Sequence, residues 1–331
     1  MPILVACLLL GWAVPGALAQ APAQPPLRQA LRDSFVAVSA PVVALHHVRV
    51  VDGTGAPPLE DQTVVLAGGQ IRAVGRYGTV TVPAGAHALD LPNHTVIPGI
   101  VGMHNHAFYG SGVGPAATRY QFSPTASPRL YLGSGVTTTR TAGGYSPYED
   151  IDLARRIDRG DAVGPRMYVA GPYITSGAGN LGAMAIVDTP DAARRVVRYW
   201  ADEGVTWFKA YTNITRAALG AAIDEAHRHG IKVTAHLCSV GYREAAALGI
   251  DGLEHGLLGD MEFHPGKKPD ECPREPMDWS TVDVNGPEVQ ATIGELVAKN
   301  VHVTATLAVF EASVPNCPPL EERVIEAMES A

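Results

Sequence analysis

The sequence predicts an α/β protein in which parallel strands form a barrel, preceded by a small β lobe. Two observations predict this fold. From Thr95 onward, short apolar strands alternate with helical segments, which is the pattern of βα units in a parallel sheet. Before that point, short strands follow one another directly and are separated by turns. The 331-residue chain is 46% hydrophobic and 18% charged, so it is able to bury a large core.

The predicted lobe comes first in the chain. Its expected strands cover 42–51, 63–66, 70–74 and 87–91. Gly68-Gly69 lies between two of these strands and predicts a hairpin. We therefore assign 42–96 to a small β-sandwich lobe whose C-terminal part is missing, and 97–331 to an incomplete barrel.

Seven strands are expected in the barrel, over 96–103, 135–141, 166–170, 205–211, 232–236, 252–255 and 301–307. Helices are expected over 190–203, 215–229 and 287–299. The first of these helices has Asp188 and Thr189 as cap candidates, Pro190 in its first turn and Gly204 as its stop. A complete TIM-type (β/α)₈ barrel takes about 250 residues and eight strands. The sequence therefore predicts such a barrel with one strand too few.

Two histidines end the first barrel strand. His104 and His106 are two residues apart, so in an extended strand they project to the same face. The carboxyl ends of barrel strands are where barrel enzymes keep their chemistry. A lone His-x-His pair is more often a pair of surface residues, so the later strands have to decide between the two interpretations.

Three later strands end in similar residues. The fourth strand places Lys209 and Tyr211 on one face, and an inward lysine in a barrel must be paired or chemically modified. The fifth strand ends in His236 and the sixth in His255. Each residue alone has an ordinary explanation, such as a hydrogen-bonded core histidine or an interior ion pair. Together, at one rim of a barrel, they predict a metal site.

These motifs resemble those of the amidohydrolase superfamily, and most of all its imidazolonepropionase-like and prolidase-like metal-dependent hydrolases. The matching stretches are Ile97-Pro98-Gly99 before His104-x-His106, Phe208-Lys209-Ala210-Tyr211, Val233-Thr234-Ala235-His236, and Gly252-Leu253-Glu254-His255-Gly256. Gly135-Val136-Thr137-Thr138-Thr139-Arg140 and Gly171-Pro172 support the resemblance, which covers about 42–307. The family usually has Arg-Asp where this chain has Arg140-Thr141.

The resemblance implies a site that holds two divalent ions, with zinc as the expected metal. His104 and His106 would bind the more buried ion, and His236 and His255 the second. Lys209, carboxylated by CO₂, would bridge the two ions through its carbamate. Two such ions about 3.5–4 Å apart share and acidify a hydroxide and polarise a scissile carbonyl. Lys209, His255 and Tyr211 are the expected catalytic residues, with Tyr211 donating a hydrogen bond to substrate.

The implied reaction is hydrolysis of an amide or peptide C–N bond in a small molecule or dipeptide. A lactone or phosphoester hydrolase on the same fold is the first alternative. The second is a catalytically inactive metal-binding fragment, because the family's metal-binding aspartate at the end of strand eight has no counterpart here. We expect a sequence truncated at its C-terminal end. The long loop 257–286 is either a lid over the site or a solvated insertion.

The remaining features concern location and partners. Met1 to Ala19 is an apolar run that ends Ala-Leu-Ala, which predicts a signal peptide and a secreted or periplasmic enzyme. Residues 20–41 form the leader, and no stable membrane anchor is expected. The net charge of −8 argues against a nucleic-acid partner, and a homo-oligomer stays open. Cys272 and Cys317 are the expected disulfide, with Cys238 as a free thiol.

Overall fold

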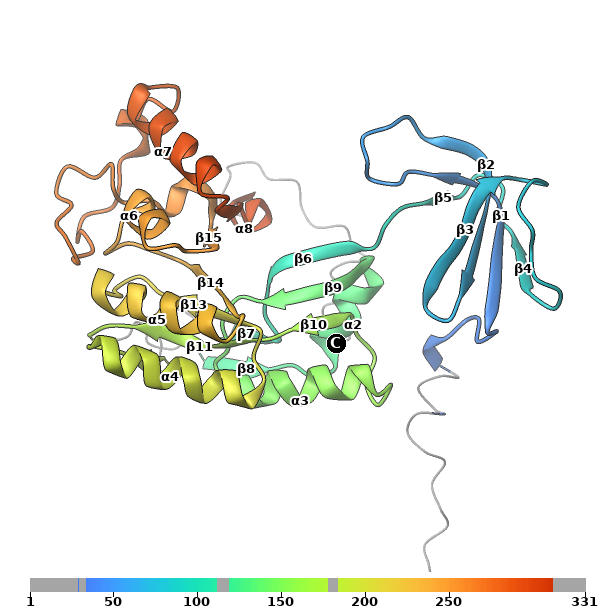
Figure 1. The fold of residues 1–331 in the computed structure, drawn as a ribbon, viewed down its shortest axis with the longest axis horizontal. Helices are drawn as coiled ribbons and strands as arrows, with labels where there is room; N and C mark the ends of the chain where they lie inside the picture. Colours follow the sequence, from blue (N-terminus) through green and yellow to red (C-terminus); the bar gives the residue numbers. More distant parts are fainter. Residues whose placement is uncertain (1–28, 30–33, 112–118, 178–183, 312–331) are drawn as a thin grey trace, which may run out of the picture.

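The computed structural model describes residues 29, 34–111, 119–177 and 184–311. Figure 1 shows a sheet of early strands beside a larger α/β body, joined through the segment between β5 (Thr95–Val96) and β6 (Ile100–Asn105). The expected signal peptide, most of the leader and Cys317 lie outside the described residues. Within the described part of the chain, no helix combines the length and the apolar character needed to cross a bilayer.

The lobe is a single five-stranded sheet in the order β3-β2-β1-β4, with β5 also pairing with β1. The predicted hairpin is present, because antiparallel β2 and β3 pair Ala67 with Gln70 and leave Gly68-Gly69 as a two-residue turn. Both glycines have positive φ, 58° and 71°, which side chains disfavour in such a turn. The described residues of the lobe contain no second sheet facing this one. The strands of the lobe are β1 (Val42–Val50), β2 (Leu59–Ala67), β3 (Gln70–Arg76), β4 (His87–Asp90) and β5.

The larger body is the predicted TIM-type α/β barrel, with seven parallel strand positions in the described residues. Two sheets form it, in the orders β10-β9-β6 and β12-β11-β13-β14-β15-β16, and every pairing within them is parallel. A bridge between Gly144 and Pro172 connects the two sheets. After β6, the second barrel position is taken by β9 (Val136–Thr141). The third position is shared by β10 (Arg166–Tyr168) and β11 (Ala170–Thr175). The remaining positions are taken by β13 (Trp207–Ala210), β14 (Lys232–Ala235), β15 (Gly252–Glu254) and β16 (His302–Thr304).

Several elements were not expected from the sequence. A hairpin of β7 (Phe108–Ser111) and β8 (Arg119–Phe122) follows the first barrel strand, and short β12 (Ala185–Ile186) pairs with β11. The last predicted strand is shorter than 301–307, because Leu307 already begins a helical turn. The other unexpected elements are helices α2 (Ala126–Gly133), α3 (Pro147–Asp158), α6 (Tyr242–Ala247) and α8 (Leu307–Glu311) and 3₁₀ turns η1 (Gly256–Gly259) and η2 (Trp279–Thr281).

The three predicted helices are α4 (Pro190–Glu203), α5 (Arg216–Arg228) and α7 (Pro287–Ala298). Helix α4 begins and ends where its sequence signals indicate. Thr189 caps it by accepting a 3.2 Å hydrogen bond from the Ala192 amide, and Gly204 ends it with a φ of 97°. Figure 1 places α4 and α5 side by side along one face of the sheet. They cover fully buried strand side chains such as Phe208, Val233 and Leu253.

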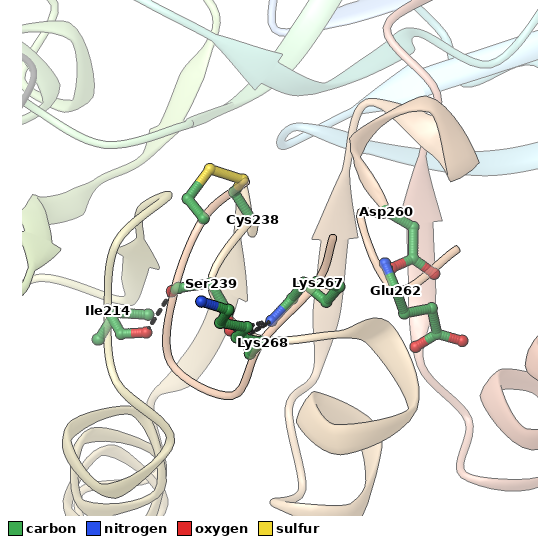
Figure 2. Close-up of a disulfide and its surroundings, with 8 residues drawn as sticks. Ile214, Cys238, Ser239, Asp260, Glu262, Lys267 and Lys268 are labelled. Atoms are coloured by element: carbon green, nitrogen blue, oxygen red, sulfur yellow. Dashed lines mark hydrogen bonds between the residues drawn. A yellow bond between two sulfur atoms is a disulfide. The ribbon is translucent and has the colours of Figure 1, made fainter. Parts of the chain in front are cut away.

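The disulfide differs from the prediction. Cys238 bonds to Cys272, with their Cα atoms 5.0 Å apart, so the predicted Cys272–Cys317 pair and the free thiol at Cys238 are wrong (Figure 2). The sequence interpretation took Cys238 as isolated at a strand end. In the fold, the loop after β15 returns across that strand end and brings Cys272 within reach. The bond ties this long loop to the segment that follows His236.

Candidate metal centre

Six aromatic rings form a closed belt at the carboxyl ends of the barrel strands. Each ring lies next to its two neighbours, with centroid separations between 4.2 and 6.5 Å. Four of the six are the histidines that the sequence predicted, and one is the predicted tyrosine. In order around the belt they are His104, His106, Tyr173, Tyr211, His236 and His255. We call this set the histidine–tyrosine belt.

Lys209 belongs to the same centre. It lies on β13, pairs in register with Thr234 of β14 and is 1% exposed. Its charge lowers the pKa of every histidine in the belt, so the amine lies among the four imidazoles. The structure thus brings together all six residues that the sequence predicted for the site.

Strand ends position the histidines. His104 lies near the end of β6, and His236 and His255 directly follow β14 and β15. His255 has a φ of 71°, a conformation that is costly for a non-glycine residue. Its backbone amide donates to the Thr304 carbonyl at 2.7 Å, and its Nδ1 lies 3.0 Å from Thr306 Oγ1. These two contacts, with the end of β16 and with the segment that follows it, fix the direction of the ring.

A buried polar network supports the belt from inside the barrel. Glu254 is fully buried, and its Oε2 lies 2.8 Å from His104 Nδ1. Its Oε1 accepts hydrogen bonds from the Arg140 guanidinium and, at 2.5 Å, from the Thr234 hydroxyl. Arg140 also donates to the carbonyl of Met103 through Nε at 2.7 Å. Glu254 and Arg140 therefore orient the strand that carries the His-x-His pair.

Electrostatics keep the Glu254 carboxylate charged. Burial alone would raise its pKa, but the hydrogen bond from His104 and the charges of Lys209 and Arg140 outweigh that effect and lower the pKa. For His104, burial is the main cause of a lowered pKa, partly offset by its hydrogen bond to Glu254. Metal-binding histidines usually donate their other ring N–H to a carboxylate or a carbonyl in this way.

The other imidazoles are neutral as well. Burial lowers the pKa of His106 and His255 to about 3 and that of His236 to about 4, and nearby positive charges add to each shift. A neutral imidazole carries a lone pair that a divalent ion can accept. Near pH 7, the four imidazoles at this rim can therefore each offer one ring nitrogen to a metal ion without first losing a proton.

Burial also changes the chemistry of Lys209. It lowers the pKa of the amine from 10.5 to about 7, although Glu254 acts in the opposite direction. Near neutral pH a large fraction of the amine is therefore unprotonated. Only the unprotonated amine is a nucleophile, so Lys209 is able to react with CO₂ to form a carbamate.

These donors fit a pair of divalent ions. Imidazole is a common ligand for zinc and its neighbours, and a carbamate would supply anionic oxygens. His106 Nδ1 is buried and has no hydrogen-bond partner among the described residues. In that same part of the chain, no three His, Cys, Asp or Glu side chains already converge on one point as ligands. A carbamate on Lys209 would add oxygen donors to the two histidine pairs.

Sequence reasoning gave no role to two residues of the buried polar network that supports the belt. Glu254 stood inside a quoted motif but received no role, although an acidic residue within an apolar strand had to be paired. Arg140 is its partner. Thr141, where the family usually has aspartate, accepts a 2.8 Å hydrogen bond from the Ala170 amide and so ties β9 to the third strand position.

The other histidines of the chain lie away from the belt. His227 and His229 end helix α5, where they pair with Asp251 and Glu225. His302 begins its strand, and His264 accepts a local hydrogen bond from Gly266. The remaining ones, His46, His47, His87 and His94, belong to the lobe or its connection.

A model of the amidohydrolase family matches residues 95–330, which is more than half of the chain. The chain belongs to the amidohydrolase family. The match begins at β5, just before the His-x-His strand, and so includes every belt residue and Lys209. The predicted membership of the amidohydrolase superfamily is thereby confirmed. A search of curated proteins returned no match.

Solved amidohydrolase structures share the fold. A putative prolidase from Bifidobacterium longum is 29% identical, with a TM-score of 0.56 over 68% of this chain and 58% of that one. A Xaa-Pro dipeptidase with bound methionine in its active site is 19% identical, with a TM-score of 0.61 over 87% and 73% of the two chains. Molinate hydrolase is 18% identical, with a TM-score of 0.58 over 79% and 62%. The chain thus spans 58% of the length of the first of these relatives.

Proposed function

We propose that this amidohydrolase is a metal-dependent hydrolase that cleaves an amide or peptide C–N bond of a small substrate. The observation that carries the proposal is the placement of Lys209 among four neutral imidazoles at one barrel rim. Family membership supports it. So do the relatives described as a prolidase and a Xaa-Pro dipeptidase.

Different residues of the site would bind the metal ions and position the metal ligands. His104 and His106 would hold one ion, His236 and His255 the other, and a carbamate on Lys209 would bridge them. When bound, the two ions would acidify a water molecule and polarise the scissile carbonyl. Glu254 would hold His104 in its metal-binding tautomer by accepting the Nδ1 proton, and Arg140 would keep that carboxylate in place.

Tyr211 would orient the substrate. Its ring lies 5.2 Å from that of Tyr173 and 5.0 Å from that of His236, so it stands on the rim of the belt. Burial raises its pKa, which keeps the phenol protonated as a hydrogen-bond donor at neutral pH. A donor at this place suits a substrate carbonyl or carboxylate.

We also propose that the protein works outside the cytosol, as the apolar N-terminal run predicts. The Cys238–Cys272 bond supports this location, because structural disulfides persist in oxidising compartments. A small-molecule or dipeptide substrate is consistent with such an enzyme, and no nucleic-acid partner is proposed.

The test is hydrolysis by the purified protein after incubation with Zn²⁺ and bicarbonate. Dipeptides, N-acyl amino acids, lactones and phosphoesters are assayed side by side, with and without a chelator. We expect C–N cleavage that the chelator abolishes and that Zn²⁺ restores. The Lys209→Ala variant should lose the activity, and Lys232→Ala, on the neighbouring strand, should keep it. Lactone or phosphoester cleavage alone, or activity that survives Lys209→Ala, would contradict the proposal.

A further inference from the structure

An apolar cavity of about 200 Å³ opens beside His255. His255 forms part of its wall, so the cavity borders the histidine–tyrosine belt directly. Apart from this imidazole and Gly256, every lining side chain is aliphatic or aromatic, and Leu258, Trp279, Val284 and Leu307 are among them. Nothing in the metal chemistry requires such a lining.

Apolar side chains around this cavity remain open to solvent. Leu258 is 46% exposed, Val284 59% and Leu307 73%. Leaving apolar area in water costs about 25 cal/mol per Å², so a concave apolar surface of this kind marks a binding site more often than chance. Its position beside a predicted metal ligand makes the substrate the natural occupant.

The wall is built from the long loop after β15, and that loop is held firmly. Trp279 begins η2, which Asp278 caps by accepting hydrogen bonds from the Ser280 amide at 3.0 Å and hydroxyl at 2.6 Å. The Cys238–Cys272 bond fixes the same loop to the segment after His236 (Figure 2). The cavity is therefore preorganised, which lowers the entropic cost of filling it.

A second set of contacts holds the first part of the loop. Glu262 Oε1 receives the Arg243 guanidinium at 2.9 Å and the Thr292 hydroxyl at 2.6 Å, which joins the loop to α6 and α7. The Tyr242 hydroxyl donates to the carbonyls of Glu254 and Gly256 at 3.0 and 2.8 Å. The backbone on both sides of His255 is thus fixed relative to the cavity wall.

We infer that this cavity is a specificity pocket for one large apolar or aromatic side chain of the substrate, with Trp279 as its main determinant. The inference rests on the proposed hydrolase function. The size agrees with it, because an apolar cavity of about 150 Å³ accommodates a benzene ring. Complete small-molecule sites are larger, about 300–1,000 Å³, so the cavity suits a side chain and not a whole substrate. The loop after β15 is thereby a fixed wall of the site, in place of a lid.

Two series of dipeptides test the pocket. In one series the first residue is Gly, Ala, Leu or Phe, and in the other series the second residue is varied in the same way. In one of the two series we expect the wild-type kcat/KM to rise with side-chain size. Trp279→Ala should lower kcat/KM for the Leu and Phe members about 10–100-fold and leave the Gly member unchanged. Val284→Trp, a filling change at an exposed position, should exclude Phe in the same series. Tyr199→Ala on α4, an aromatic truncation far from the pocket, is the control.

A binding measurement separates this inference from the proposed function. Toluene is titrated into the wild-type protein while the indole N–H signals are followed by NMR, with Trp279 assigned by its absence in Trp279→Ala. A saturable shift of the Trp279 signal supports the pocket even if no dipeptide is cleaved, which would remove only the hydrolase proposal. Two results would overturn the pocket. One is a Trp279→Ala variant whose kcat/KM falls equally for dipeptides with small and large side chains, and the other is a Trp279 signal that does not shift with toluene.

Discussion

The central strands of the barrel and the two strands at its ends are packed very differently. Every residue of β11 and β15 is buried, and so is every residue of β13 after Trp207 and of β14 after Lys232. On β6, in contrast, Ile100, Val101 and Met103 are 37–55% exposed, and Val303 on β16 is 44% exposed. Figure 1 shows β6 on the side of the body that faces the lobe, away from α4 and α5.

The candidate metal centre spans both kinds of strand. Lys209, His236 and His255 come from the packed strands, whereas His104 and His106 come from β6 and its end. Apolar packing therefore fixes the strands that carry Lys209, His236 and His255, whereas polar contacts with Glu254 and Arg140 hold the strand that carries the His-x-His pair. Changes to the polar network should weaken metal binding at His104 and His106 first. Changes to the packed strands should lower the free energy of unfolding and should not weaken one pair of metal ligands more than the other.

The largest expected effect comes from Glu254→Gln. The change leaves the buried Arg140 guanidinium without its carboxylate, which should cost about 3–5 kcal/mol of unfolding free energy. Loss of the charged acceptor should also weaken metal binding through His104 by about 10–100-fold. Urea unfolding and zinc titration measure the two effects. Glu288→Gln, in the first turn of α7, is the matched control. A stability loss below about 1 kcal/mol would show that the network does not hold β6.

The second prediction concerns the disulfide, which lies beside the packed strands β14 and β15. Cys238→Ser with Cys272→Ser opens a loop of 34 residues and should lower the unfolding free energy by about 2–4 kcal/mol. Urea unfolding with and without a reductant checks this, because a reductant should bring the wild-type protein to the level of the double variant. Metal affinity at His104 and His106 should stay the same, so a selective loss there would undermine the division into two halves.

Acid should destabilise the metal-free protein. Burial lowers the pKa of His106 to about 3, whereas an unfolded histidine takes up a proton near 6.5. Between these values the unfolded state binds more protons, so stability falls as the pH drops below 6.5, by about 1.4 kcal/mol per pH unit for this residue. Urea unfolding from pH 7 to 5 should show a shallower slope for His106→Gln than for the wild type. Equal slopes would mean that His106 is protonated in the folded protein.

The smallest effect is expected at the start of α4. Thr189→Ala removes a cap that accepts from the Ala192 amide and should cost about 1 kcal/mol. Because α4 packs on the central strands, metal stoichiometry should not change. Thermal unfolding together with metal analysis checks both statements, and Thr189→Ser, which keeps the hydroxyl, should restore the stability. A change in bound metal would show that packing far from the rim controls the site.

The sequence predicted what depends on local pattern. The limits of α4, the Gly68-Gly69 turn and the histidines at the strand ends follow from caps, turn conformation and strand alternation, all of which act within a few residues. The parallel α/β barrel followed from the alternation of strands and helices. These features were predictable because neighbouring residues determine them.

Long-range contacts were not predictable in the same way. The Cys238–Cys272 bond depends on the path of a loop that carries no periodic signal, so the sequence indicated the wrong pair. Tyr173 joins the belt only because β11 lies next to β13. The role of Glu254 required knowing that Arg140, 114 residues earlier, faces it across the barrel interior.

The most direct test of the metal centre is the metal content of the protein after it has been loaded with Zn²⁺ in the presence of ¹³C-bicarbonate. The wild-type chain should bind about two ions and show a carbamate signal by ¹³C NMR, and Lys209→Ala should lose the signal and at least one ion. His227→Ala, which removes a histidine outside the belt, should match the wild type. A wild-type chain without bound metal, or equal stoichiometry in Lys209→Ala, would contradict a binuclear centre built around Lys209.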